Sequence, residues 1–259
     1  EIVGYVGAHV DNKSTNNVTS TLSGKWDLSG EAYLVAAQKD EIRLTAKEGH
    51  GGVIGVGGTS VDNTINTTTN ATIANDTEIT ADRVHVGTGN SVTTGAYDDK
   101  DGNGNTDAQT YTLQDHFGGV ISGNRLRSLL DVTENGTVTV GKNAKITTNH
   151  LQEYIAASEN DLTNHASAKG GGAVAVTDTV TENKLTINNT VNVNSGATLN
   201  NEKTASTEDI LLAAYDEHKL NSHADATVGG VAGVLVSKNE TTMKRKSNVD
   251  VAGTIESGS

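Results

Sequence analysis

The sequence predicts an all-β fold, a β-solenoid of stacked strands with short helical or loop insertions. Three observations predict it: a glycine-rich apolar opener recurs five times, alternating apolar and polar residues follow each opener, and none of the 259 residues is proline. Period-2 alternation turns one face of each strand inward. Strands whose N–H groups all pair with neighbours leave no place for proline.

The openers divide the chain into five unequal units. They begin at residues 4, 51, 118, 171 and 229, so consecutive openers lie 47, 67, 53 and 58 residues apart. Recurrence at such spacings is typical of repeat architectures, in which each unit buries its apolar face on its neighbours. We therefore expect a single solenoid segment over 1–259. An antiparallel sandwich would also alternate, but it gives no reason for a repeated opener.

Turn residues interrupt the alternation at equivalent places. Two apolar residues two apart are followed by a turn with Gly or Asn and then by another apolar residue, as in 71–81, 137–147 and 190–199. These residue types tolerate the positive φ of tight turns. The outward positions are mostly Thr and Asn, which suit strands and stacked ladders.

Three stretches break this pattern and predict short helices or loops. They are 31–38, 152–158 and 209–216, and each combines a Tyr with an Ala-Ala pair. Thr207 is a candidate N-cap for the third. Such insertions either cover the side of the solenoid or contact a partner, because loops on one face of a repeat protein are where binding usually occurs.

Composition excludes several classes of protein. Without cysteine there are no disulfides, zinc-thiolate sites or thiol catalysis. A net charge of −13 argues against nucleic acid and anionic membranes as partners. The single basic cluster, 244–246, is interpreted as a solvated face. No apolar run is long enough for a transmembrane helix.

The longest unit contains a candidate calcium loop within an expected insertion at 87–117. Oxygen-bearing side chains alternate along it, and Gly104 allows a sharp bend, as in the first part of an EF-type loop. The acid expected at the last position is replaced by Thr110, for which Asp98 or Asp115 would have to substitute. The alternative is an exposed turn without an ion. The candidate ligands are Asp99, Asp101, Asn103, Asn105 and Asp107.

Catalytic signals are weak. Aromatic residues make up 3% of the chain, which leaves few platforms for sugar rings in a lyase-like groove. Glu159 and Asp161 form a carboxylate pair whose meaning depends on their spacing in space. His218 and His223 are five residues apart, which is wrong for a zinc site on one helical face. We therefore expect no enzymatic activity and no certain cofactor.

The glycine-rich openers, with Asn-Thr-Ile-Asn at 63–66 and Asn-Ala-Thr-Ile at 70–73, resemble repeats of filamentous-haemagglutinin-like exoproteins. The resemblance is closest to the leukotoxin-type filamentous adhesins of diderm bacteria, and it is clearest in 51–86 and 171–200. It implies a right-handed parallel β-helix that is secreted across the outer membrane by two-partner secretion and displayed at the bacterial cell surface.

These observations favour a non-catalytic structural or adhesive shaft segment of a large secreted exoprotein. Its expected partners are flanking repeats of the same chain or neighbouring filament subunits, together with a receptor on a host or bacterial surface. Both termini resemble cut ends, because the chain opens within an apolar strand-like run and lacks a closing element. The alternatives are a self-assembling fibre or surface-layer subunit, part of a toxin-type exoprotein, and a polysaccharide-acting enzyme.

Overall fold

Alternating burial along very long strands is the dominant feature of the computed structural model, which describes residues 3–43, 46–95, 113–202 and 209–257. Every strand pair is parallel. The prediction of an all-β fold with parallel strands is therefore confirmed. The strands are β1 (Val3–Leu22), β2 (Lys25–Asp27), β3 (Glu31–Arg43), β4 (Ala46–Ile73), β5 (Glu78–Ala81), β6 (Arg83–Gly95), β7 (Leu113–Val140), β8 (Lys145–Thr148), β9 (Gln152–Val193), β10 (Thr198–Asn201), β11 (Ile210–Val251) and β12 (Thr254–Ser257).

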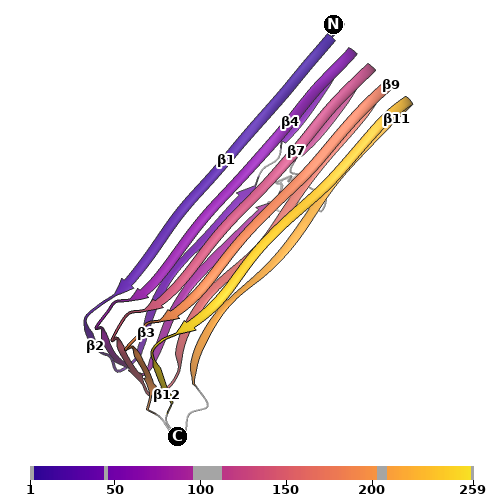
Figure 1. Cartoon of the computed structure of the whole chain (residues 1–259). Coiled ribbons are helices and arrows are strands. Elements are labelled where there is room, and N and C mark those ends of the chain that lie inside the picture. The colour runs from indigo at the N-terminus through magenta and orange to yellow at the C-terminus, as the bar shows by residue number, and fades with distance from the viewer. Residues whose placement is uncertain (1–2, 44–45, 96–112, 203–208, 258–259) are drawn as a thin grey trace.

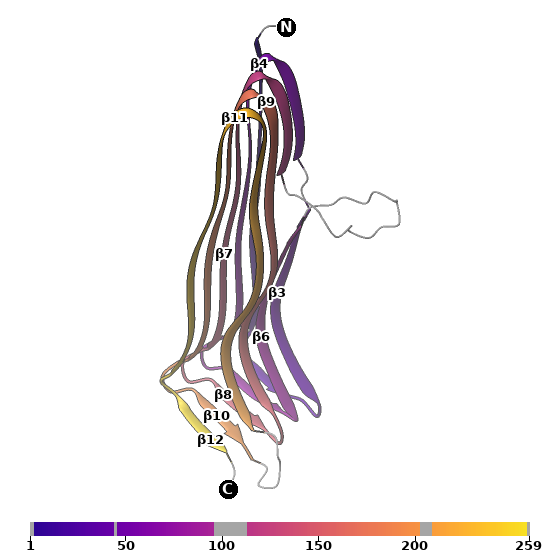
Figure 2. The same cartoon turned by 90° about the vertical axis from the view of Figure 1, so that its right-hand side faces the viewer.

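The chain passes repeatedly through the same three positions (Figures 1 and 2). The first wall contains β1, β4, β7 and the C-terminal parts of β9 and β11. The base strip contains the short strands β2, β5, β8, β10 and β12, and the second wall contains β3, β6 and the N-terminal parts of β9 and β11. Figure 2 shows β9 and β11 bending over at the end opposite the base strip, which we call the apex.

Consecutive passages are held in register along the whole first wall. One ladder joins Val3 to the residues Ile54, Ile121, Val174 and Ala232. The sequence separations between paired residues are 51, 67, 53 and 58. Three of these equal the spacings of the openers, whereas the first differs because Gly4 pairs with Gly55 rather than with Gly51.

Glycine pairs stack at the apex and explain the openers. Gly51 and Gly52 pair with Gly118 and Gly119, and the ladder continues through 171–172 to 229–230. A Cβ at Gly172 would collide with the carbonyl oxygen of Gly119. The openers are therefore the places where the backbone of one passage lies too close to the previous one for a side chain.

The turns between the first wall and the base strip also stack. Asp76 and Asn143 have φ of 56°, and Gly196 has φ of 75°. The Asn143 Nδ2 donates a hydrogen bond to the Asp76 Oδ1 over 3.0 Å. These positive φ values agree with the turn pattern in the sequence, because Gly, Asn and Asp adopt the left-handed conformation most readily.

Outward positions near the base of the first wall form an uncharged array. Four adjacent strands each contribute four outward side chains there, and all sixteen are Thr or Asn, as the alternating stretches predict. The residues are Thr15, Asn17, Thr19, Thr21, Asn66, Thr68, Asn70, Thr72, Thr133, Asn135, Thr137, Thr139, Thr186, Asn188, Thr190 and Asn192.

Inward side chains form apolar clusters separated by a polar layer. The largest cluster lies next to the base strip and includes the ladder of Ile79, Ile146 and Leu199. A smaller cluster further along the walls includes Ile65 and Leu185. Between the two clusters lies a set of inward polar residues that we call the polar band: Asp40, Thr67, Thr69, Thr88, Asn90, Glu134, Ser158, Asn160 and Asn189.

The expected helical insertions are wrong. Within the described residues, 31–38 belong to β3, 152–158 to β9 and 210–216 to β11. The β3 and β9 segments are joined in register through β6, and the β11 segment pairs directly with that of β9. Tertiary pairing overrides the helix propensity of their Ala and Leu residues because each segment has at least one parallel neighbour. The described residues include no helix that is long and apolar enough to span a membrane.

The expected insertion at 87–117 overlaps two regular strands at its ends. Residues 87–95 lie in β6, and 113–117 lie in β7. Arg43 pairs with Gly95, and Ala46 pairs with Leu113. The chain therefore needs two residues, 44–45, to pass from the first pair to the second in one passage, and 96–112 to do so in the next. The extra length of this unit is therefore confined to 96–112.

Candidate binding groove

The candidate calcium ligands lie outside the described residues, as does Asp98. Asp115, the other proposed substitute, is fully buried in β7 near the apex. Its carboxylate accepts a hydrogen bond from Asn124, and its Oδ1 lies 4.0 Å from the His50 Nδ1. In the part of the chain that the structure describes, no group of three His, Cys, Asp or Glu side chains could hold a metal ion. Calcium binding stays a prediction.

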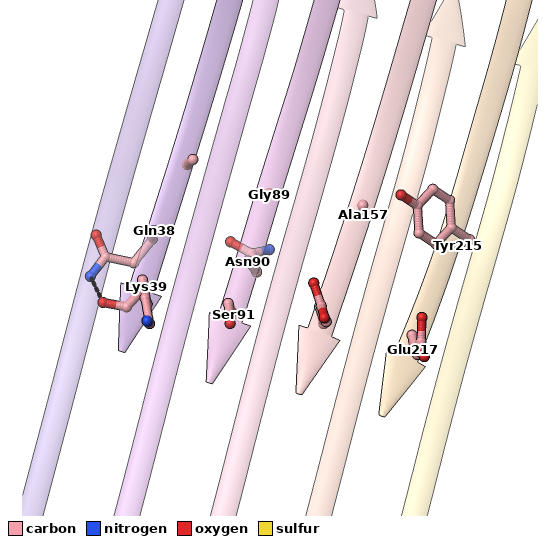
Figure 3. Close-up of a pocket in the computed structure, with 10 residues that line it drawn as sticks. Gln38, Lys39, Gly89, Asn90, Ser91, Ala157, Tyr215 and Glu217 are labelled. Carbon is pink, nitrogen blue, oxygen red and sulfur yellow. Dashed lines mark hydrogen bonds between the residues drawn. The ribbon is translucent and has the colours of Figure 1, made fainter. Parts of the chain in front are cut away.

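A groove on the outer face of the second wall is the clearest candidate site. Two adjoining pockets, each of about 470 Å³, open there and share Lys39, Ser91, Glu159 and Glu217. Figure 3 shows its residues coming from adjacent strands, with Tyr215 and Glu217 at one side and Lys39 at the other. The outward residues of the groove are Ala37, Lys39, Gly89, Ser91, Thr93, Ala157, Glu159, Asp161, Tyr215, Glu217 and Lys219.

Small side chains on β6 form the floor of the groove. The strand alternates strictly, so its outward positions include Gly89, Ser91 and Thr93 while its inward positions are buried. Ala37 of β3 and Ala157 of β9 pair with Gly89 in the same row. The row ends at Tyr215, which pairs with Ala157 and is 51% exposed. A run of small residues beside a large aromatic ring therefore creates the hollow.

The next row carries the charges of the groove. Lys39 pairs with Ser91, Ser91 with Glu159, and Glu159 with Glu217. Within the described residues, the side chains of Lys39, Glu159 and Glu217 have no hydrogen-bond or ion-pair partner. Two carboxylates on adjacent paired positions repel each other, so both are available to accept hydrogen bonds from a ligand.

One further row closes this part of the groove. The Lys219 Nζ lies 3.7 Å from the Asp161 Oδ2, and both side chains are more than half exposed. Such an exposed pair contributes little to stability, on the order of 1 kcal/mol or less. Glu159 and Asp161, which are two residues apart in the sequence, therefore lie on the same outward face of β9. The carboxylate of Asp161 is paired with a lysine, whereas that of Glu159 has no such partner among the described residues.

A network of polar contacts lies on the same face toward the base. The Tyr33 ring stacks on His85 with centroids 4.6 Å apart, and the His85 Nδ1 lies 2.7 Å from the Glu153 Oε2. Tyr33 also donates a hydrogen bond to Glu31. That bond lowers the pKa of the Glu31 carboxyl and raises the pKa of the Tyr33 hydroxyl. These groups are engaged with one another, unlike Lys39, Glu159 and Glu217 of the groove.

The polar band inside the fold is a second place with unusual chemistry. The Asn160 Nδ2 donates a hydrogen bond to the Glu134 Oε2 over 2.8 Å, whereas the Glu134 Oε1 is buried without a partner. Burial raises the pKa of the Glu134 carboxyl above its ordinary value of 4.5, and Asp40 and Asp216 raise it further. The Glu134 side chain is fully buried. We therefore expect the polar band to affect the stability of the fold rather than ligand binding.

Sequence reasoning missed the groove because it treated its residues as parts of separate insertions. Ala37, Ala157 and Tyr215 come from the three stretches expected to be helical. A signal was available: Ala156 follows Ala36 by the distance that separates the openers at 51 and 171. That coincidence indicates equivalent positions two passages apart, with Thr88 of β6 between them. Comparison with protein-family models, curated proteins and solved structures finds no match for the chain.

Proposed function

We propose that the chain is a non-catalytic structural and adhesive shaft segment of a large secreted exoprotein, displayed on a bacterial cell surface. In this proposal the repeated passages are coils of a right-handed parallel β-solenoid, the hand preferred by parallel strands joined through a crossover. The sequence resemblance supports secretion and surface display. The stacking of paired, in-register passages supports a mechanical role.

Exposed ladder ends carry the proposal. Along one inward ladder of the base strip, Ile79, Ile146 and Leu199 are at most 1% exposed, whereas the end members Trp26 and Ile255 are 42% and 43% exposed. A further strand stacked on either end would bury that residue as its neighbours are buried. The unpaired backbone edges of β1 and β11 would gain hydrogen bonds at the same time.

The dimensions of the segment indicate how large such a shaft would be. A strand of 20 residues such as β1 spans about 65 Å at ~3.3 Å per residue, whereas neighbouring strands lie only ~4.8 Å apart. About fifteen passages would be needed before the stack became longer than it is wide. A rod built on this cross-section therefore belongs to a large protein.

End-to-end stacking of identical copies is the alternative to continuation by flanking repeats. Among the described strands, the first wall and the base strip contain five positions each, whereas the second wall contains four. A copy that placed its β1 on β11 and its β2 on β12 would leave one second-wall position vacant. Light scattering tests this alternative: a monomer at high micromolar concentration supports the shaft, and concentration-dependent fibres would favour the self-assembling subunit.

The groove does not by itself indicate catalysis. Glu159 and Glu217 are both exposed, so neither lies in the buried environment that separates a general acid from a general base. Release of reducing ends from polysaccharides, abolished by Glu159→Gln or Glu217→Gln, would overturn the non-catalytic proposal in favour of the enzyme alternative.

Tandem duplication of one passage tests the solenoid directly. Val140 and Val193 are paired, so inserting a second copy of 141–193 after residue 193 adds one whole passage in register. We expect one cooperative unfolding transition with a steeper denaturant dependence and greater stability, because stability in stacked repeats sums over neighbouring interfaces. Separate unfolding or rapid proteolysis of the added passage would overturn the proposal.

Matched variants of the added copy control for composition. Lysine at Ile187 and Val191 of that copy would place charges at positions that are fully buried in the parent chain. Lysine at Asn188 and Thr190 would place them on the outward face of the same strand. Only the inward pair is expected to abolish the gain in stability, since a buried unpaired charge is costly.

A further inference from the structure

We propose that the groove on the second wall binds a short, linear, uncharged oligosaccharide. Tyr215 would stack on the apolar face of a sugar ring, while Glu159 and Glu217 accept hydrogen bonds from hydroxyl groups and Lys39 donates one. Neither the repeat pattern nor the shaft proposal assigns this site. The inference also does not depend on the shaft proposal, because a folded single chain contains the complete groove.

Shape supports an elongated ligand. The two adjoining pockets extend over three outward rows, from Gly89 to Thr93 along β6. The four residue-to-residue steps from Gly89 to Thr93 cover about 13 Å. The floor is continuous because every outward residue of β6 in this stretch is Gly, Ser or Thr. The walls rise at Tyr215 on β11 and at Lys39 on β3, so a chain-like molecule can lie along the strand direction (Figure 3).

Hydrogen-bonding chemistry favours a sugar over a peptide. An extended peptide would bind a sheet through an unpaired strand edge, but β6 lies inside the wall, paired with β3 on one side and β9 on the other. Only side chains are therefore presented to a ligand. Two carboxylates and an ammonium group without partners match the many hydroxyl groups of a sugar, each of which both donates and accepts.

The aromatic residue supplies the apolar part of the recognition. Tyr215 is half exposed at the edge of the pocket and makes no ring contact with another aromatic residue in the described part of the chain. An amphipathic ring at the rim of a wet site offers apolar area together with a polar tip. Tyr33, in contrast, is already stacked on His85.

Charge indicates which sugars are excluded. The groove has two unpaired carboxylates against one unpaired lysine, in a chain whose net charge is −13. Uronate or sulfated chains would meet repulsion from Glu159 and Glu217, because like charges in close approach cost free energy. We therefore expect uncharged sugars to bind better than acidic ones of the same length.

Calorimetric titration of the 259-residue chain tests the proposal. The probes are cellohexaose, maltohexaose, chitohexaose and mannohexaose, with hexagalacturonate as the acidic comparison. At least one uncharged hexasaccharide is expected to bind, and hexagalacturonate is expected to bind at least tenfold more weakly. Failure of all four uncharged probes, or tightest binding of hexagalacturonate, would overturn the proposal.

Three variants identify the site. Tyr215→Ala is expected to weaken binding about tenfold. Gly89→Leu would fill the floor, and the backbone there accepts a side chain, because a Cβ at Gly89 would meet only the Ala37 Cβ at 3.8 Å. Tyr5→Ala, at a more exposed Tyr on β1 outside the groove, is the control. Loss of binding in both groove variants but not in the control supports the site; unchanged binding in both overturns it.

The two tests fail independently. Tandem duplication measures the stacking of passages and leaves the groove residues unchanged in sequence. Sugar binding is measured on the undivided single chain. A folded chain that stacks but does not bind sugar would overturn only the groove proposal, and a chain that binds sugar without gaining stability on duplication would overturn only the solenoid shaft.

Discussion

The Asn160 Nδ2 donates a hydrogen bond to the Glu134 Oε2 over 2.8 Å, and this contact joins the two walls inside the polar band. The other carboxyl oxygen of Glu134 has no partner. A buried carboxyl with one satisfied oxygen is costly to ionise. Glu134 is therefore the residue whose titration should be most visible in the stability of the fold.

Glu134→Gln should remove a pH-dependent loss of stability. Because burial raises the folded-state pKa of Glu134 above 4.5, the contribution of this group is fully present below the unfolded pKa and is lost as pH rises through the folded pKa. The variant should therefore be more stable than the parent at neutral pH, with a difference that shrinks as the pH falls. Urea titrations between pH 4 and pH 8 measure this difference, and a difference that does not grow with pH would contradict the assignment.

Left-handed turns should tolerate glycine at Asn143 but not a β-branched residue. Asn143 has φ of 56°. Asn143→Val is expected to cost about 1–2 kcal/mol because L-residues with a branched Cβ are disfavoured there. Asn143→Gly should cost less, since it loses only the hydrogen bond to Asp76. Chemical denaturation distinguishes the two, and equal losses would contradict the role of φ.

Apex glycines should be far more sensitive than a glycine on an open stretch of the first wall. A Cβ at Gly172 would collide with the Gly119 carbonyl, whereas a Cβ at Gly123 meets no atom within 4 Å. Gly172→Ala should therefore cost about 1–3 kcal/mol. Gly123→Ala should be nearly neutral. Thermal unfolding measures both, and a comparable loss in the two variants would argue against close packing at the apex.

Position along one ladder should set the cost of truncating an isoleucine. Ile146 is buried in the middle of the base strip, and Ile255 is 43% exposed at its end. Ile146→Ala should cost about 2–5 kcal/mol. Ile255→Ala should cost about half as much or less, because less apolar area leaves water on folding. A larger loss at Ile255 would contradict an open end there.

Local chemistry made the strands and turns predictable. Alternation places Ile79 and Ile146 inward, and the turn residues Asp76 and Asn143 adopt the positive φ that their type allows. These features depend on residues close in sequence. The three stretches that combine a Tyr with an Ala-Ala pair were misassigned because the propensity of a single segment carries no information about its partners. The stretches in β9 and β11 pair directly, and β6, which has a different composition, lies between those in β3 and β9.

The groove depends on register, which local sequence does not determine. Gly89, Ala157 and Tyr215 become neighbours only because β6, β9 and β11 pair without a shift. A one-residue slip would turn all three to the other face. The burial of Glu134 was equally hard to predict from the sequence. The alternating pattern places this residue inward, but a charged side chain is normally found at the surface.

The distance between the two ends of one outward ladder tests the stacking of passages most directly. Thr21 and Asp250 are joined through Thr72, Thr139 and Asn192, so four strand spacings separate them. Because the chain has no cysteine, Thr21→Cys and Asp250→Cys provide unique sites for spin labels. We expect an electron-spin distance distribution centred near 20 Å, from four steps of ~4.8 Å. A distribution centred beyond about 40 Å would contradict parallel, in-register stacking of the passages.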